Sequence, residues 1–129
     1  MATIIAEYYT DELVEWNRLI AFNNREMDEF KHKLAEVIQR NTIPNIAAKV
    51  EEQQDKLNTV SKKFFKLRVQ IQQQEAALKT DSILIDDSVI NAETEKQQNE
   101  LRRNMHRIEK EYVDSKYECY NFLSQILRK

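Results

Sequence analysis

The 129-residue chain contains no glycine and only one proline, Pro44. Phosphate-binding loops, dinucleotide-binding fingerprints and nucleophile elbows all need glycine, because their backbones turn sharply or approach a ligand closely. The sequence therefore excludes these three kinds of motif. It also lacks the residues that most often interrupt helices, which favours long, unbroken ones.

Cysteine and histidine are almost as scarce, with one cysteine, Cys119, and two histidines. A single cysteine cannot form an internal disulfide, so we expect a reducing compartment and a thiol that serves as a small core residue. Glu29 and His32 have the i, i+3 spacing of carboxylate-bridged di-iron bundles. Such a site needs a second Glu-x-x-His, but Arg103 stands three residues before His106. We expect no metal, no cofactor and no small-molecule substrate.

Long apolar runs are absent as well, since none approaches the roughly 18 residues that a membrane-spanning helix requires. The N-terminal stretch "MATIIAEYYTDEL" has neither the basic start nor the longer apolar core of a signal peptide. A net charge of −2 gives no overall attraction to nucleic acid or to an anionic membrane. We expect a soluble, cytoplasmic protein without membrane contact.

Apolar residues recur every three or four positions along most of the chain, a spacing typical of amphipathic helices. Short connections between such helices make neighbours antiparallel. We predict an all-α fold, an up-down-up antiparallel three-helix bundle or coiled coil. Its helices are expected at about residues 10–41, 43–79 and 88–128.

The ends of these helices have recognisable signals. Thr10 is the expected N-cap of the first helix, which leaves residues 1–9 as an N-terminal tail before a single domain of residues 10–129. Pro44 suits the first turn of the second helix, with Thr42 or Ile43 as its cap. Residues 80–87 are expected to form a loop. The cap of the third helix is expected among Asp86, Asp87 and Ser88.

Each predicted helix carries one seam of heptad-spaced residues that we expect to be buried. The first seam is Leu13, Trp16, Ile20, Asn23, Met27, Phe30, Leu34 and Val37. The second is Ile43, Ile46, Val50, Gln53, Leu57, Val60, Phe64, Leu67, Ile71, Gln74 and Leu78. The third is Leu101, Met105, Ile108, Tyr112, Ser115, Cys119, Phe122 and Ile126. Polar residues at seam positions, such as Asn23, Gln53 and Gln74, are expected to fix the register of the helices.

Two clusters of basic residues are predicted to meet at mid-height of the bundle. A hairpin that turns near residue 83 would bring residue 64 level with about residue 102. Such a belt could bind phosphates or an acidic partner. The simpler interpretation is that these are ordinary solvated charges, some of them paired with nearby glutamates. The predicted basic belt consists of Lys62, Lys63, Lys66, Arg68, Arg102, Arg103 and Arg107.

Some apolar residues lie off the seams, which indicates an association surface. Phe65 and Val69 lie on the far side of the second helix from its seam, and we expect Phe22 to lie near them. A wider buried stripe in a three-helix bundle would bury some of these residues instead. Self-association is the simplest use of such a surface.

The layout, with Trp16 in the first helix, resembles that of spectrin-like three-helix repeats. This resemblance is one of architecture and implies no partner.

Together the patterns indicate a non-catalytic scaffold or adaptor that acts through protein–protein contacts and associates with itself. The alternative is a nucleic-acid or polyanion binder that uses the basic belt. An enzyme is the third and least supported hypothesis, because the sequence contains no constellation of catalytic residues.

Overall fold

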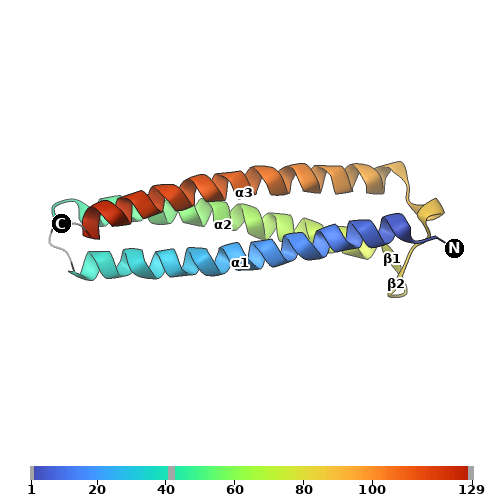
Figure 1. Ribbon diagram of the computed structural model, residues 1–129, viewed down its shortest axis with the longest axis horizontal. Coiled ribbons are helices and arrows are strands. Elements are labelled where there is room, and N and C mark those ends of the chain that lie inside the picture. Colours follow the sequence, from blue (N-terminus) through green and yellow to red (C-terminus); the bar gives the residue numbers. More distant parts are fainter. Residues whose placement is uncertain (1, 41–42, 128–129) are drawn as a thin grey trace.

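The computed structural model describes residues 2–40 and 43–127, without the side chain of Leu127. Its long helices are α1 (Ile4–Arg40), α2 (Ile46–Ala77) and α3 (Ala92–Leu127). They lie side by side along one rod and alternate in direction (Figure 1), which confirms the predicted all-α, up-down-up bundle. Short elements join α2 to α3: strands β1 (Lys79–Thr80) and β2 (Ile83–Leu84), and a 3-10 turn, η1 (Asp87–Val89).

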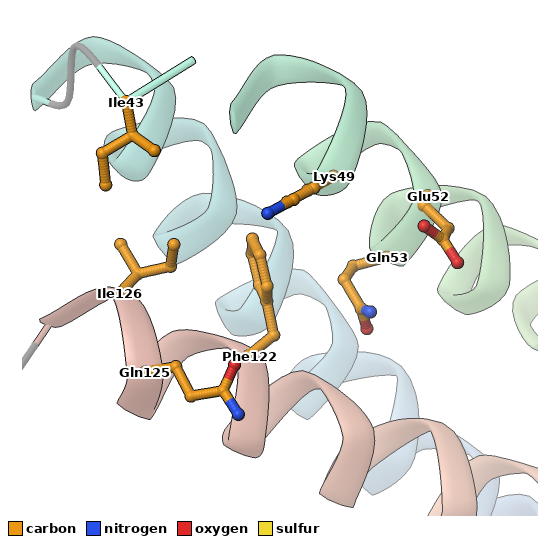
Figure 2. Close-up of a pocket in the computed structure, with 7 residues that line it drawn as sticks. All are labelled: Ile43, Lys49, Glu52, Gln53, Phe122, Gln125 and Ile126. Atoms are coloured by element: carbon orange, nitrogen blue, oxygen red, sulfur yellow. The ribbon is translucent and has the colours of Figure 1, made fainter. Parts of the chain in front are cut away.

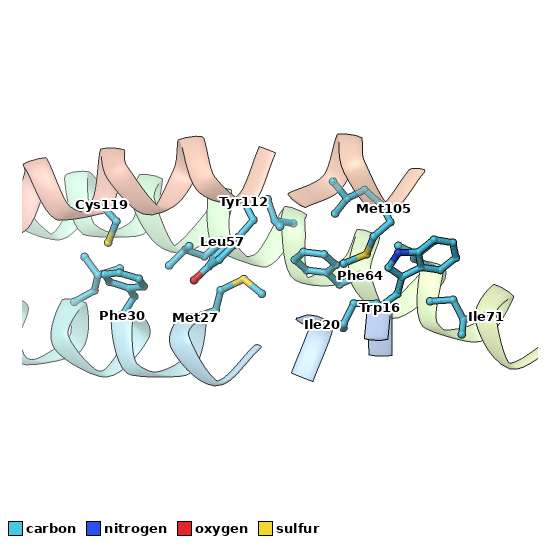
Figure 3. Packing of buried hydrophobic residues seen from close by; sticks show 14 of the residues in the cluster. Trp16, Ile20, Met27, Phe30, Leu57, Phe64, Ile71, Met105, Tyr112 and Cys119 are labelled. Atoms are coloured by element: carbon cyan, nitrogen blue, oxygen red, sulfur yellow. The ribbon is translucent and has the colours of Figure 1, made fainter. Parts of the chain in front are cut away.

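The three seams form the core, as their spacing predicted. Every predicted position of the first seam is buried, and so is every position of the second except Ile43, which is half-buried. Phe64 of α2 meets Tyr112 of α3 edge to face, with ring centroids 6.2 Å apart. Figure 3 shows these rings and the neighbouring aliphatic and sulfur-containing side chains filling the space between the helices. The apolar residues of the interior form one continuous cluster.

The third seam departs from prediction toward its C-terminal end. Leu123 is buried there, whereas Phe122 and Ile126 are half-buried, and Ser115 is half-buried further up the helix. A straight helix has 3.6 residues per turn, so a strict seven-residue repeat drifts by about 20° per heptad. Over several heptads this drift moves the buried position from residue 122 to residue 123.

The predicted N-terminal tail is wrong for residues 4–9, which are helical. Thr10, the expected N-cap, lies inside α1. The cap comes instead from Asp87, whose Oδ1 accepts hydrogen bonds from the backbone N–H groups of Ile5 at 2.9 Å and Ala6 at 3.5 Å. A carboxylate at this place satisfies free helical donors and opposes the positive end of the helix dipole. Asp87 N–H also donates to the Ala2 carbonyl, which ties the start of α1 to the α2–α3 connection (Figure 1).

The turn between α1 and α2 also differs from expectation. Helix α2 begins at Ile46, so Pro44 precedes the helix and does not occupy its first turn. Asn45 is the residue before the helix and has φ 66°, a left-handed conformation that asparagine tolerates better than most residues. Thr42, one of the two expected caps, lies outside the described residues, and Ile43 does not cap the helix by a side chain.

The expected loop after α2 contains a short β-hairpin with two residues in each strand. Its strands pair Lys79 with Leu84 and Thr80 with Ile83. The two turn residues, Asp81 and Ser82, have φ 52° and 67°, and positive φ at both positions is what a type I′ turn requires. In a chain without glycine, aspartate and serine take these positions.

The predicted cap of α3, among Asp86, Asp87 and Ser88, is wrong. Asp86 accepts hydrogen bonds from the backbone N–H and hydroxyl of Ser88 and so caps the 3-10 turn, and these bonds lower the pKa of its carboxyl. Asn91 caps α3, because its Oδ1 accepts from Thr94 N–H at 2.8 Å. The predicted caps therefore serve the 3-10 turn and α1.

We expect Asp87→Ala to lower the free energy of unfolding by about 1 kcal/mol, because the first turn of α1 loses its carboxylate cap. Urea unfolding would measure this loss, and hydrogen exchange of the Ile5 and Ala6 amides should become faster. Asp114→Ala, at an exposed position in α3, is the control and should stay within about 0.5 kcal/mol of the wild type. Unchanged exchange at Ile5 and Ala6 would contradict the capping role.

Candidate functional site

An apolar patch lies on the outward face of α2. Phe65 is 71% exposed and Val69 is 39% exposed, and their i, i+4 spacing places them one turn apart on the same face. Lys62 precedes Phe65 by one turn, Lys66 precedes Val69 by one turn, and both lysines are exposed. The α2 patch is therefore a Phe65–Val69 pair bordered by two ammonium groups.

Phe22 does not join this patch, although it is 50% exposed. Glu26, one turn further along α1, accepts hydrogen bonds from Tyr112 and Lys116 of α3, so this side of α1 is turned toward α3. In α2 the α3-facing side is marked by Lys63, which pairs with Glu111. Phe65 is two residues from Lys63 and so about 200° around the helix from it. The three residues of the expected association surface therefore lie in two separate places, Phe22 on α1 and the Phe65–Val69 pair on α2.

Ion pairs already engage two members of the basic belt. Lys63 Nζ lies 2.7 Å from Glu111 Oε2 of α3. Arg102 forms a two-pronged contact with Glu12 of α1, in which its Nε lies 2.8 Å from Glu12 Oε2. The hydrogen bond to Glu12 raises the pKa of the Arg102 guanidinium despite the opposing effect of burial. These two cations have acidic partners within the bundle.

The register between α2 and α3 differs from the one expected. Lys63 meets Glu111 and Lys56 meets Glu118, so the middle of α2 lies well beyond residue 102 along α3. The hairpin and the 3-10 turn make the connection asymmetric, so the chain does not reverse evenly about residue 83. Arg102 and its neighbour Arg103, which is exposed, consequently lie nearer the hairpin end than Lys62 and Lys63.

A smaller group of basic residues does meet across α2 and α3. Lys63, Lys66 and Arg107 line one groove of about 310 Å³. Leu67, Gln70, Asn104 and Ile108 complete its lining. Within the described part of the chain, the ion pairs involve neither Lys66 nor Arg107. Arg68, the remaining member of the basic belt, is exposed three residues beyond Phe65. The groove is suited to an anionic group.

A buried polar network at the hairpin end is the main feature that the sequence analysis missed. Gln98 is fully buried. Its Nε2 donates to the Tyr9 carbonyl and to Glu12, and its Oε1 accepts from Gln74 at 3.0 Å. Gln74 also donates to the Thr94 carbonyl, so the three helices are joined by amide hydrogen bonds. Spacing could have found Gln98, because it lies three residues before Leu101 on the same seam.

A second polar cluster lies between α1 and α3. The Tyr112 hydroxyl donates to Glu26 at 2.7 Å, and Lys116 Nζ lies 3.0 Å from the same carboxylate. Burial acts to raise the pKa of Glu26, but the hydrogen bonds from Tyr112 and Lys116 and the Lys116 charge leave that pKa below its usual value. Burial and then the bond to Glu26 raise the pKa of Tyr112. The cluster holds a carboxylate in its charged form and a phenol in its neutral form.

A pocket near the Pro44 end offers little chemistry. Figure 2 shows its seven lining residues, which come from the start of α2, the end of α3 and the turn before α2. Its volume is about 320 Å³, and Lys49 and Glu52 are its only ionisable groups. No nucleophile stands beside a base among these residues. The lining is Ile43, Lys49, Glu52, Gln53, Phe122, Gln125 and Ile126.

The cysteine and the two histidines lie apart. Cys119 is buried in the core, and its burial raises the pKa of the thiol to about 11. His32 and His106 are exposed, as is Glu29. Among the described residues, no group of three or more His, Cys, Asp or Glu side chains is placed to share a metal ion.

The chain matches no known family model, no curated protein and no solved structure. The resemblance to spectrin-like repeats thus gains no support from these comparisons. Over the described ranges, none of the helices combines the length and the apolar character needed to cross a membrane.

The Glu26 cluster predicts a defined response to acid. Because folding lowers the pKa of Glu26, its contribution to stability is complete above the unfolded pKa of about 4.3 and is lost as the pH falls through the folded pKa. Tyr112→Phe should lower the free energy of unfolding at pH 7 by about 1 kcal/mol and weaken this acid dependence. Chemical unfolding from pH 7 down to about pH 3 would measure both effects.

Tyr117→Phe is the matched control, because Tyr117 is exposed on the same helix. It should leave both the stability and its pH dependence close to those of the wild type. A Tyr112→Phe variant with the wild-type dependence on acid would contradict the role given to the Glu26 cluster.

Proposed function

We propose that this chain is a non-catalytic helical-bundle protein that acts through protein–protein contacts, as a small scaffold or adaptor, and associates with itself. The observation that carries this proposal is the α2 patch. A phenylalanine that is 71% exposed beside a partly exposed valine costs free energy in water, and covering both would recover it. Aromatic anchors with a polar border are typical of interface centres.

The interior supports the same proposal. The core is closed by packed apolar side chains, and the pocket and groove described above lie at the surface between helices. Neither gathers the nucleophile, base and oxyanion donors that a catalytic centre needs. The scarcity of cysteine, with Cys119 inside the core, suits a reducing compartment, and we place the protein in the cytoplasm on that ground.

The test is native mass spectrometry of the purified protein at low and high micromolar concentration, with Phe65→Lys as the variant. We expect the wild type to form an oligomer as concentration rises, and we expect Phe65→Lys to remain a monomer, because a charge replaces the apolar anchor. Phe65 is so exposed that the variant should keep its fold, which circular dichroism would verify.

Phe22→Lys provides the matched control, since it introduces the same charge at another exposed phenylalanine outside the α2 patch. It should associate like the wild type. A wild type that stays monomeric at every concentration would overturn self-association, and equal loss in both variants would show that the α2 patch is not the specific surface.

The second candidate function is polyanion binding, favoured by the groove that Lys63, Lys66 and Arg107 share. Lys66→Glu/Arg107→Glu should elute from heparin at a clearly lower salt concentration than the wild type, because phosphate-like contacts depend on salt. The control is Lys79→Glu/Lys96→Glu, which changes the net charge equally at exposed positions near the hairpin. Equal shifts in both double variants would show attraction by net charge alone and would contradict a site in the groove.

A further inference from the structure

The exposed face of α2 changes the sign of its charge along its length. Glu51 and Asp55 occupy this face in the first half of the helix, and Lys62 and Lys66 occupy it in the second. All four side chains are exposed. The ion pairs in the described part of the chain include none of them.

The spacing of these charges is unfavourable within one molecule. Glu51 and Asp55 stand at i, i+4, and so do Lys62 and Lys66, which places like charges on adjacent turns. Such pairs destabilise an isolated helix, whereas opposite charges at the same spacing would stabilise it. The arrangement therefore leaves two acidic and two basic groups on one face that are free to pair with opposite charges of another molecule.

We propose that the α2 patch binds a second copy of this chain, with the two α2 helices antiparallel about a two-fold axis between Asn58 and Thr59. This inference rests on the proposed function and specifies both the partner and the register. In a two-fold interface the same surface is used by both copies, so each contact occurs twice. The charges then match: Asp55 faces Lys62 of the second copy, and Glu51 faces Lys66.

The apolar residues fit the same register. The two-fold operation that pairs Asp55 with Lys62 also places Val69 opposite the second copy's Ala48. Ala48 is exposed and small, so the two helices can approach closely at both ends of the contact. Phe65 falls level with residue 52 of the second copy. Glu52 is turned toward α3, where it lines the pocket near the Pro44 end. Glu51 lies only about 40° around the helix from Phe65, so Phe65 can lie along the aliphatic part of the second copy's Glu51. Apolar contacts thus flank the ion pairs on either side of the axis.

The exposed face of α3 does not offer this complementarity. Its middle turns present Arg103, Arg107 and Lys110, all exposed and all positive. A two-fold pairing centred on these turns would bring cations against cations, which disfavours a second copy there and suits an anionic partner.

The contact between two single helices is small for a stable dimer, so we expect a Kd in the micromolar range. It should also depend on salt, because all four ion pairs lie at the surface. Raising the salt from about 0.1 M to about 1 M shortens the screening length from about 10 Å to about 3 Å and should weaken dimerisation several-fold.

Two double variants test the register. Lys62→Glu/Lys66→Glu makes the whole stripe acidic, and Glu51→Lys/Asp55→Lys makes it basic. Each variant alone should dimerise at least about tenfold more weakly than the wild type, because every ion pair becomes a like-charge pair. Mixed in equal amounts they should form a heterodimer, in which all four pairs are attractive again. Native mass spectrometry separates the heterodimer from either homodimer by mass.

A heterodimer that forms more tightly than either homodimer is the expected result. Double variants that dimerise like the wild type, or a mixture that fails to form the heterodimer, would overturn the antiparallel register. If Phe65→Lys is monomeric while both double variants still dimerise, the α2 patch stands and only the register is wrong. If the wild type never dimerises, the proposed self-association fails together with this inference.

Discussion

The buried seam of α2 is the constraint on which the rest of the structure depends. One flank of this helix faces α3, through the pairs of Lys56 and Lys63 with Glu118 and Glu111, and the other faces α1, where Glu75 accepts from Asn17. Because both flanks of α2 contact other helices, only the side chains on its outward stripe remain accessible to another molecule. The architecture therefore determines in advance which α2 residues can meet another molecule.

The two ends of the bundle are held together by different physical means. Toward the Pro44 end the seams are mainly apolar, with Gln53 as a buried polar member, and burial of hydrocarbon is the main contribution. At the hairpin end the first turns of α3 carry almost no apolar residues, and the amides of Gln74 and Gln98 close the core together with Glu12 and Arg102. Buried polar groups are costly in any alignment that leaves them without partners, so we expect this end to determine the register that the apolar seams alone would allow to slip.

The sequence predicted burial far better than it predicted ends and pairings. Periodicity identifies the core-facing residues because burial in a bundle follows directly from position on the helix. Periodicity could not predict where α1 starts, because the residue that caps this helix, Asp87, is more than eighty positions away in the chain. The level at which α2 meets α3 depends on the shape of the connection between them. That connection contains a hairpin whose turn residues, Asp81 and Ser82, are left-handed, and the sequence has no glycine there to indicate such a turn. The predicted basic belt placed residues of α2 and α3 at the wrong relative height for that reason. The exposure of Phe65, by contrast, follows from the helical period alone.

A surface with charges of both signs can specify orientation as well as affinity. If two α2 helices paired in parallel and in register, Lys62 would face Lys62 and Asp55 would face Asp55, so the contact would be repulsive throughout its length. Antiparallel pairing turns each repulsion into an attraction. In the proposed dimer, the phenylalanine and valine would supply the reason to associate, while the reversal of charge along the helix would select one geometry among those that bury them. Discrimination of this kind requires a straight, uninterrupted helix, which a chain free of glycine and almost free of proline provides.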